Sequence, residues 1–501
     1  MAFSFQNPSL IALGVVFLAV LVVIGLFLLS PVKPEKTVPS KEVRRAAAAG
    51  SFYPADPVAL KSQIEKDLNS IQKVASGRPL RVLIVPHAGL DYSGPTAASA
   101  FKQLAGSSYN KIILIGPSHH HLFGYAAVDN SSSWETPLGK VDFDADLAAK
   151  IISVPQNIIT DRSVNADEHS LEMEVVFLQS VLPDFKIVPI LISNPSDELI
   201  TALAYRIAQN MDKETLLVVS SDLSHYPDYA TADMVDKKTI AAVISGNMDY
   251  FQTLPSGVDT LACGFEAIRV ADRVSRFLAL DPPQLIKYQN SGDITGDKSR
   301  VVGYGAIGYT GSNLSLVVPE LSPEAKTEAL NIARTTLDNF VRNKTIPGGI
   351  NIIHPELYAP LGAFITLRKK GDLRGCIGEF EPDKPLYKVI QDKTIAAAST
   401  DPRFNPVTRD ELKDISLEIS VMTPKQKISD WHNIKLGTDG VVVIRDNHAG
   451  TFLPQVATDT GWKLEEFLGH LCAEKAGLNE NCYTSPATDI YIFQAQVFAG
   501  S

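Results

Sequence analysis

Two histidines and one cysteine of this chain have side chains that could hold a metal ion. His87 and His119 each follow a short apolar run, in LRVLIVPHAG and KIILIGPSHHH, and Cys263 lies in LACGFEAI. Neutral imidazole and thiolate are good ligands for iron, zinc or copper, and such a set leaves coordination positions open. These three residues therefore predict a mononuclear centre for redox or Lewis-acid chemistry.

Other polar side chains accompany this set. Asp222 precedes His225 by three residues in TLLVVSSDLSHY, so the carboxylate could orient the imidazole as a general base, or His225 could be a fourth ligand. In DEHSLEME, His169 and Glu172 would share one helical face, which permits contacts with a substrate or with a ligand. His120 belongs to a run of three histidines, of which only one need be a ligand.

Each of these residues also has an interpretation without chemistry. Most free cysteines are small buried hydrophobes, two histidines of the triple run would be solvated in a polar loop, and His169 alone is better explained as a cap or a surface group. Chance explains the whole set less well than it explains any one residue, because six of the ten histidines fall between His87 and His225.

The apolar runs predict how these residues are brought together. Residues 82–85, 112–115 and 216–219 are typical of buried parallel strands, and ligands of open α/β sheets bind at the carboxyl ends of strands. We therefore expect the polar residues at one edge of one sheet. Cys263 precedes a predicted helix, whose N-terminus would lower the thiol pKa and favour the thiolate.

The chain divides into two predicted domains. From 46 to 309, strand-like runs alternate with helical stretches, which is typical of a doubly wound α/β domain. Residues 310–321 contain Gly, Ser, Asn and Pro and predict a linker. Ser322 then caps a helix that opens a second domain, 322–501, which lacks βα alternation and is predicted to be α+β.

An apolar N-terminal segment predicts a membrane anchor. Residues 10–29 are all apolar or glycine, and as a helix they would span the hydrocarbon core of about 30 Å. We predict a transmembrane helix within 1–30 and a juxtamembrane linker at 31–45, whose basic residues would place the globular part in the cytoplasm. A cleaved signal peptide is disfavoured, since no Lys or Arg precedes the apolar run.

Composition limits the remaining function classes. A formal net charge of −10 and a pI of about 5.5 argue against nucleic acid as a partner. The cysteines have no CxxC spacing and are too few for a disulfide framework, so reduced thiols in a cytosolic setting are expected. They are Cys263, Cys376, Cys472 and Cys482.

Ordered motifs in both domains resemble two known families. Residues 46–309 are similar to the Memo family, protein B of the AmmeMemoRadiSam system, through AGSFYPADP, PHAGLDYSG, LIGPSHH, WETPLG, DEHSLEME, SSDLSHY and ACG. The second domain resembles the AMMECR family, protein A of the same system, through LRGCIG, DPRFNPV, TFLPQVA and WKLEEFLGHLCAEKAGL. The chain thus resembles a fusion of both proteins.

The Memo resemblance implies a fold shared with class III extradiol dioxygenases, which use non-haem iron. Carried over by position, His87, His119 and Cys263 would be ligands of a divalent metal, with iron favoured and copper or zinc as alternatives. Asp222 and His225 would line the pocket. The dioxygenases have a carboxylate as third ligand, so a softer, oxidisable thiolate argues against ring cleavage but not against redox chemistry.

The resemblance also implies a radical SAM protein as partner, encoded elsewhere, because this chain has no CxxxCxxC motif. In the second domain, Arg374, Gly375 and Cys376 could form an anion-binding turn with a reactive thiol, or a tight turn with the thiol packed inside. The expected function is a membrane-tethered enzyme that modifies a small molecule or peptide. The alternatives are a non-catalytic protein-binding scaffold and a zinc-dependent hydrolase.

Overall fold

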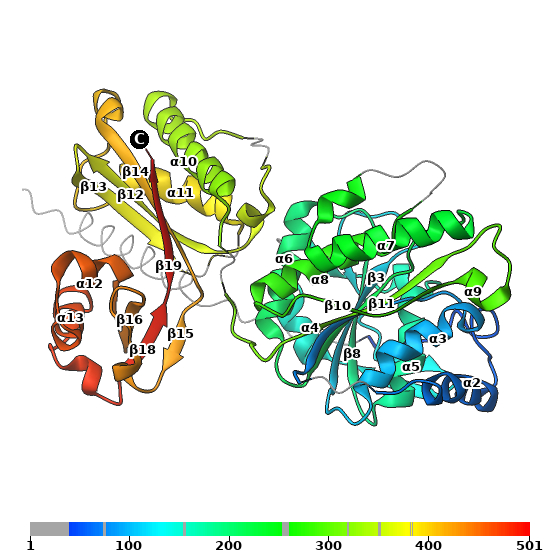
Figure 1. Ribbon diagram of the computed structural model, residues 1–501. Coiled ribbons are helices and arrows are strands. Elements are labelled where there is room, and N and C mark those ends of the chain that lie inside the picture. The colour runs from blue at the N-terminus through cyan, green and yellow to red at the C-terminus, as the bar shows by residue number, and fades with distance from the viewer. Residues whose placement is uncertain are drawn as a thin grey trace, which may run out of the picture.

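The computed structural model describes residues 40–73, 77–153, 157–252, 260–317, 320–348, 352–380, 382 and 384–500. Within these residues the chain forms two bodies, each with its own sheets and helices, joined after the last strand of the first body (Figure 1). The first body contains the predicted metal ligands, and the second contains the LRGCIG signature.

The first body is built on one sheet in which the described strands run in the order β1-β5-β6-β8-β3-β9-β2-β11-β10, with β4 and β7 beside β8. The central neighbours β8, β3, β9 and β2 are parallel, while β10, β11 and β2 are antiparallel to one another in turn. The strands are β1 (Val43–Arg44), β2 (Leu80–Val85), β3 (Lys111–Pro117), β4 (Ala126–Val128), β5 (Ser133–Thr136), β6 (Gly139–Phe143), β7 (Ile158–Thr160), β8 (Lys186–Ile192), β9 (Thr215–Ser220), β10 (Gln284–Asn290) and β11 (Gly303–Thr310).

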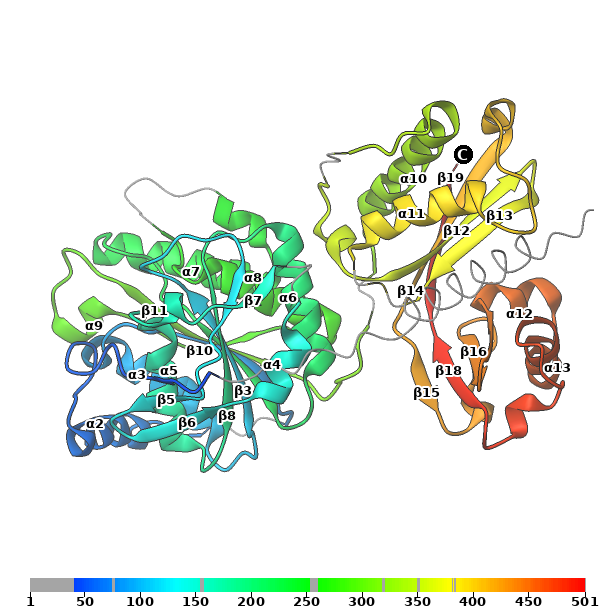
Figure 2. The same ribbon diagram turned by 180° about the vertical axis from the view of Figure 1, so that it is seen from behind.

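Helices cover both faces of this sheet (Figure 2). Because successive strand side chains point to opposite faces, Val82 and Ile84 of β2 belong to one apolar cluster, with α4, α6, α7 and α8, while Leu83 and Val85 belong to another, with α2, α3 and α5. The helices are α2 (Pro57–Asn69), α3 (Leu90–Phe101), α4 (Ala145–Ile151), α5 (Ser170–Val181), α6 (Asp197–Asn210), α7 (Tyr229–Ser245), α8 (Phe265–Phe277) and α9 (Ser291–Thr295). This two-sided burial explains why the strands are almost uninterrupted apolar runs.

The second body has two antiparallel sheets, in the orders β13-β12-β14-β19 and β15-β18-β16-β17. As predicted, its first helix has Ser322 as N-cap, and the Ser322 hydroxyl accepts the Ala325 N–H. The elements are α10 (Pro323–Asn343), β12 (Gly362–Lys369), β13 (Asp372–Glu379), α11 (Leu386–Ser399), β14 (Ile415–Met422), β15 (Gln426–Ile428), β16 (Gly440–Arg445), β17 (His448–Phe452), α12 (Pro454–Thr460), α13 (Leu464–His470), β18 (Asp489–Phe493) and β19 (Ala495–Gly500).

The predicted membrane anchor needs correction. The span at residues 10–29 lies outside the described residues, and in the part of the chain that the structure describes no helix combines the length and apolar character needed to cross a membrane. A one-helix anchor therefore has no support in this fold. The transmembrane helix in the predicted fold class, the single-pass membrane location and the cytoplasmic placement that depended on the helix are therefore not supported.

The prediction of four reduced thiols is wrong for one pair. Cys472 and Cys482, ten residues apart, form a disulfide, and both are buried in the apolar cluster around α13. No CxxC spacing marks this pair in the sequence, since the two cysteines are ten residues apart. Cys263 and Cys376 are free.

A buried ion pair attaches the start of the first body to α5. The Arg44 guanidinium lies 2.6 Å from the Glu172 carboxylate, and the exposed fraction of the two side chains is 4% and 0%. Glu172 also accepts hydrogen bonds from the Tyr53 hydroxyl and from the N–H groups of Ala47 and Ala48. Glu172 thus fixes the segment before α2 and does not face the metal ligands.

Replacing Arg44 by Met should lower the free energy of unfolding by about 3–5 kcal/mol, because it leaves the Glu172 carboxylate buried without its cation. Urea unfolding followed by circular dichroism measures this. The matched control is Arg162→Met, which breaks an exposed pair with Glu42 and should change stability little. Equal effects of the two substitutions would contradict the role given to Arg44.

Candidate metal centre

Three neighbouring strands end at the candidate site. His87, His119 and Asp222 each stand two residues beyond the carboxyl end of β2, β3 and β9. Because β9 lies between β2 and β3 and is parallel to both, the three residues meet at one edge of the sheet. Cys263 reaches the same place from the segment just before α8. One ligand atom from each of His87, His119 and Cys263 lies within 4.8 Å of the others.

His87 is held in the form that binds metals. Its ring is buried, and its Nδ1 lies 2.7 Å from the Ser220 hydroxyl. Burial, together with the imidazoles of His119 and His169, keeps the pKa of His87 well below its ordinary value. The ring is therefore neutral, with its Nδ1–H donated to Ser220, and Nε2 is left facing the Cys263 Sγ at 3.3 Å.

A carboxyl group lies behind Ser220. The Glu174 Oε1 is 2.8 Å from the Ser220 hydroxyl, and the Glu174 side chain is wholly buried in α5. Burial holds the pKa of Glu174 well above its ordinary value, so this carboxyl stays protonated. The sequence analysis did not identify either residue, although an acidic residue among the apolar positions of a helix was a usable signal.

His119 is oriented by Glu168. The Glu168 carboxylate accepts the His119 backbone N–H at 2.5 Å and lies 2.9 Å from His119 Nδ1. Burial acts to raise the pKa of Glu168, but the hydrogen bonds from His119 outweigh it and hold that pKa below its ordinary value. Glu168 is thus ionised and fixes the His119 ring through Nδ1, which leaves Nε2 for a metal.

Cys263 is a partly buried thiol beside a carboxylate. Burial raises the pKa of Cys263, and the nearby Asp222 carboxylate raises it further, although the Sγ accepts the Asp222 N–H at 3.2 Å. The expectation that the helix N-terminus lowers this pKa is therefore wrong, because burial dominates. A thiolate here needs a positive charge close by, and a divalent cation held by His87 and His119 would supply it.

Asp222 and His225 have different partners from those predicted. The Asp222 carboxylate accepts the backbone N–H of His87 at 2.9 Å and of Ala88 at 3.3 Å, so it fixes the loop that carries the ligand. The His225 Nδ1 lies 2.9 Å from the Leu223 carbonyl oxygen. No hydrogen bond joins Asp222 to the His225 ring within the described chain, although the two groups interact electrostatically.

His169 forms a wall of the site, whereas His120 is exposed. The His169 ring stacks on His119, with centroids 4.6 Å apart, and contacts Phe52 at 4.2 Å. With His119 and Glu168, His169 forms a second group of possible ligand atoms. Burial lowers the pKa of His169 to about 4, so this ring is also neutral at physiological pH.

The donor set fits a divalent metal. The Nδ1 atoms of His87 and His119 are already engaged, which leaves Nε2 of each ring for a metal, and Cys263 supplies a sulfur ligand. The His119 side chain is 30% exposed, so the site is open on that side. Three protein ligands with an open side are typical of a catalytic site rather than of a closed structural site.

The LRGCIG signature is not a turn, which corrects both interpretations made from the sequence. Arg374, Gly375 and Cys376 lie within β13. Gly375 is required by packing, because a Cβ there would lie 2.2 Å from the Ala397 carbonyl oxygen of α11. Arg374 donates to both oxygens of Glu411, at 3.0 and 3.1 Å. Arg374 is therefore engaged inside the protein.

Comparison with known proteins divides the chain into the same two regions as the structure. Residues 44–308 match the model of the family described as Memo-like protein, and residues 330–498 match AMMECR1. A MEMO1 family protein of Sulfolobus acidocaldarius is 35% identical over 280 residues, which are 52% of this chain and 97% of the relative. A MEMO1 family protein of Nitrosopumilus maritimus is 32% identical over 277 residues, 53% of this chain and 99% of the relative.

The second region is similar to other proteins. A protein of Methanothermobacter thermautotrophicus is 42% identical over 188 residues, which are 36% of this chain and 95% of the relative. The crystal structure of an uncharacterized protein from Pyrococcus horikoshii aligns with 36% of this chain and 94% of its own, at 33% identity and a TM-score of 0.35.

Replacing Glu168 by Gln should weaken divalent-metal binding by about 10- to 100-fold, because the His119 ring loses the charged group that orients it. Competition with a metal-sensitive dye measures the affinity. Asp167→Asn is the control, since Asp167 contacts only the exposed His121 among the site histidines, and it should bind metal as the unaltered chain does. Unchanged affinity in Glu168→Gln would contradict the assignment.

Asp401 should make the second body sensitive to acid. Its hydrogen bonds, first from Arg403 and also from the Cys376 N–H, lower the pKa of Asp401 to about 2 from 3.8. Because the folded-state pKa is depressed, the stabilisation is complete above about pH 4 and is lost as the pH falls through about 2.

Asp401→Asn should therefore lower the free energy of unfolding by about 2 kcal/mol at pH 7. The difference in stability between this variant and the unaltered chain should shrink as the pH falls below about 4. Urea unfolding at a series of pH values checks this. Asp430→Asn, at an exposed carboxylate, should have little effect at any pH. A difference for Asp401→Asn that stays constant down to low pH would count against this account.

Proposed function

Because the chain belongs to the Memo-like protein family and joins that domain to an AMMECR1 domain, we propose that its first domain is a metal-dependent enzyme. The centre is held by His87, His119 and Cys263, and it modifies a small molecule or peptide by oxidation. Iron is the favoured metal, with copper and zinc as alternatives. The convergence of three ligand atoms within 4.8 Å at the ends of the central strands carries this proposal.

The chain's own groups have separate tasks in this proposal. A bound divalent ion would supply a Lewis acid and, as iron or copper, a redox centre. Asp222 holds the His87 loop through two backbone N–H groups. The His225 Nδ1 donates to the Leu223 carbonyl, which leaves Nε2 as the ring nitrogen that can exchange a proton with a substrate.

The wall of the site favours a substrate with a flat or apolar part. The Phe52 ring is in contact with His169, which stacks on His119, and the low pKa of His169 keeps its ring uncharged. Two uncharged rings in contact bind an apolar group and exclude water from the region next to the ligands. The thiolate ligand in place of a carboxylate speaks against cleavage of a catechol ring.

A peptide-binding scaffold is the second candidate, and one observation favours it. Large apolar side chains are exposed close in sequence to the site residues: Tyr92 is 47% exposed, Leu122 84% and Tyr226 52%. Such residues are common at binding surfaces for proteins. A zinc hydrolase would use the same ligands without a redox response. A radical SAM protein as partner remains a prediction from the family resemblance.

The test is metal analysis of the chain purified without oxygen, compared with the double variant His87→Ala, Cys263→Ser. The proposal expects one equivalent of metal in the unaltered chain and none in this variant. The matched control, His121→Ala with Cys376→Ser, removes a neighbouring histidine and the other free thiol, and it should retain the metal. An unaltered chain without metal, or a variant that keeps it, would support the scaffold.

A spectroscopic readout separates the redox centre from the hydrolase. A bound iron or copper ion should change its paramagnetic resonance spectrum between the oxidised and the dithionite-reduced protein, and the Cys263→Ser variant should have a different spectrum because it loses a sulfur ligand. One equivalent of zinc without any such spectrum would favour the hydrolase over the proposed oxidative chemistry.

A further inference from the structure

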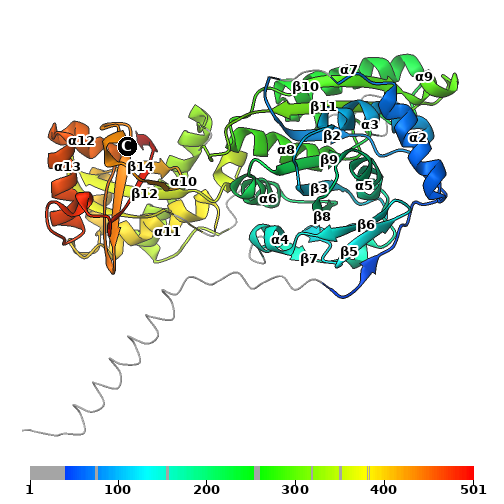
Figure 3. The same ribbon diagram turned by 90° about the horizontal axis from the view of Figure 1, so that it is seen from below.

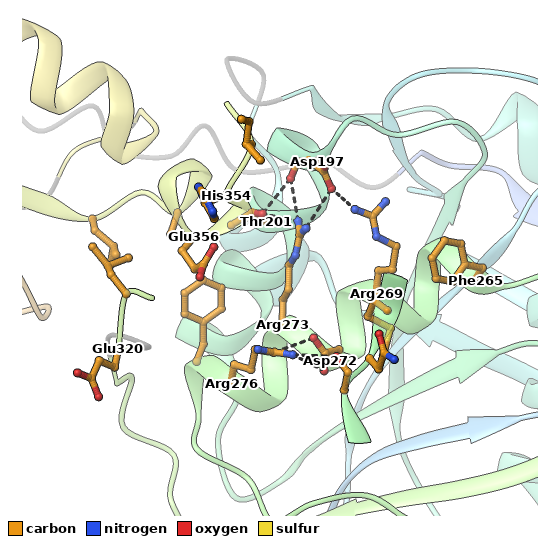
Figure 4. Close-up of a pocket in the computed structure, with 18 residues that line it drawn as sticks. Asp197, Thr201, Phe265, Arg269, Asp272, Arg273, Arg276, Glu320, His354 and Glu356 are labelled. Atoms are coloured by element: carbon orange, nitrogen blue, oxygen red, sulfur yellow. Dashed lines mark hydrogen bonds and ion pairs between the residues drawn. The ribbon is translucent and has the colours of Figure 1, made fainter. Parts of the chain in front are cut away.

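A cavity of about 930 Å³ lies where the two bodies meet (Figure 4). One wall consists of residues of α6 and α8 and of the segment 246–248. The other is formed by Glu320 and Leu321, just before α10, and by Ile353, His354, Glu356, Ala359 and Leu361 of the second body. The turn Pro355–Tyr358 packs against α6, and both α6 and α8 lie on the side of the first body that faces the second (Figure 3). A cavity of this volume falls within the range of about 300–1,000 Å³ typical of small-molecule sites.

The wall formed by the first body is rich in arginine. Arg269, Arg273 and Arg276 occupy one face of α8 and line the cavity. Arg269 and Arg273 are largely buried, with 18% and 13% of their side chains exposed, and both pair with the same carboxylate, that of Asp197. Arg276 pairs with Asp272 at 2.8 Å. Three guanidinium groups therefore share two cavity-lining carboxylates on this wall.

A third carboxyl group, that of Glu266, pairs with Arg269 outside the lining of the cavity. Glu266 accepts a hydrogen bond from Arg269 at 2.8 Å, but it is not among the residues that line the cavity. Burial raises the pKa of Glu266 to about 7, although Arg273 acts to lower it. Among the groups that line the cavity itself, three guanidinium groups therefore stand beside two carboxylates on this wall.

The opposite wall carries two carboxylates. Glu320, just before α10, and Glu356 line the cavity on this side, together with the imidazole of His354. Glu320 is exposed and pairs with Lys326 at 3.5 Å. Glu356 is only partly exposed, it accepts a hydrogen bond from the Ser322 hydroxyl at 3.3 Å, and it forms no ion pair with the residues that the structure describes. It interacts with Arg273 across the cavity only at longer range, so a cationic group that enters could pair with this carboxylate.

We propose that the cavity between the two bodies binds a zwitterion, a free amino acid or short peptide. Its carboxylate lies against Arg269 and Arg273, and its ammonium group lies against Glu356. A guanidinium group matches a carboxylate in shape and charge. The apolar part of the ligand lies against Phe265, Phe277 and Leu321, which also line the cavity.

The site requires both domains. The two MEMO1 family relatives described above span about half of this chain, and the Methanothermobacter relative spans the other region. The arginine wall lies in the Memo-like region and Glu356 in the AMMECR1 region. Opposed charges on the two walls are therefore a property of the joined chain, and the site differs from the metal centre in both place and chemistry.

Titration calorimetry of the full chain with L-leucyl-L-leucine and L-leucine tests this proposal. At least one of them should bind, and its N-acetyl and C-terminal amide derivatives, which each lack one charge, should bind at least about tenfold more weakly. Tighter binding of the dipeptide would identify a peptide site, and equal binding an amino-acid site. Failure of both to bind at millimolar concentration, or equal binding of the derivatives, would overturn the proposal.

Variants test which charged group of the ligand each wall recognises. Glu356→Gln should abolish the preference for the free amine over the N-acetyl derivative while preserving the preference for the free carboxylate, and Arg273→Gln should do the reverse. Lys388→Gln, which removes a contact between the bodies with Glu198 at 3.4 Å outside the cavity, should bind normally. If Arg273→Gln fails to fold, Glu356→Gln decides the matter, and an unchanged preference for the free amine in it would overturn the proposal.

Discussion

The candidate site depends on the parallel register of three strands. β9 pairs in register with β2 on one side and with β3 on the other, so their carboxyl ends lie at nearly the same level. The chain then places its chemistry at the same distance beyond each strand, as His87, Asp222 and His119. A shift of one residue would turn side chains to the opposite face of the sheet.

Acidic residues from one segment keep this arrangement rigid. Glu168, Glu172 and Glu174 are all buried at or within the start of α5, and each has its own partner. Glu168 orients His119, Glu172 binds Arg44, and Glu174 lies behind Ser220, which in turn contacts His87. Buried carboxyl groups are costly unless they are paired or protonated. Glu168 and Glu174 thereby constrain the orientation of the two histidine ligands, whereas Glu172 anchors the segment before α2.

Much of this arrangement could be predicted from the sequence, because it depends on patterns within short segments. Apolar runs followed by His87, His119 or Asp222 identified the strands and their functional ends, and Ser322 with Pro323 identified the start of α10. Partners distant in sequence could not be predicted. Glu168 and His119 are 49 residues apart, and Asp222 contacts the backbone of His87 rather than the nearby His225 ring.

The errors have similar physical causes. The pKa of Cys263 was expected to follow its position at a helix N-terminus, but burial decides it. LRGCIG suggested a turn because of its glycines, yet Gly375 lies in a strand where α11 comes too close for a Cβ. Local conformation can be predicted from neighbouring residues. The desolvation of a thiol and the close approach of a helix to a strand depend on which distant elements pack together.

X-ray absorption spectroscopy of the metal-loaded chain would test the central claim most directly, because it reports the atoms bound to the metal. The account predicts one sulfur ligand and two imidazole ligands, with the sulfur lost in Cys263→Ser and one imidazole lost in His119→Ala. A spectrum with only oxygen and nitrogen ligands, unchanged by Cys263→Ser, would show that the metal binds elsewhere and would contradict the account.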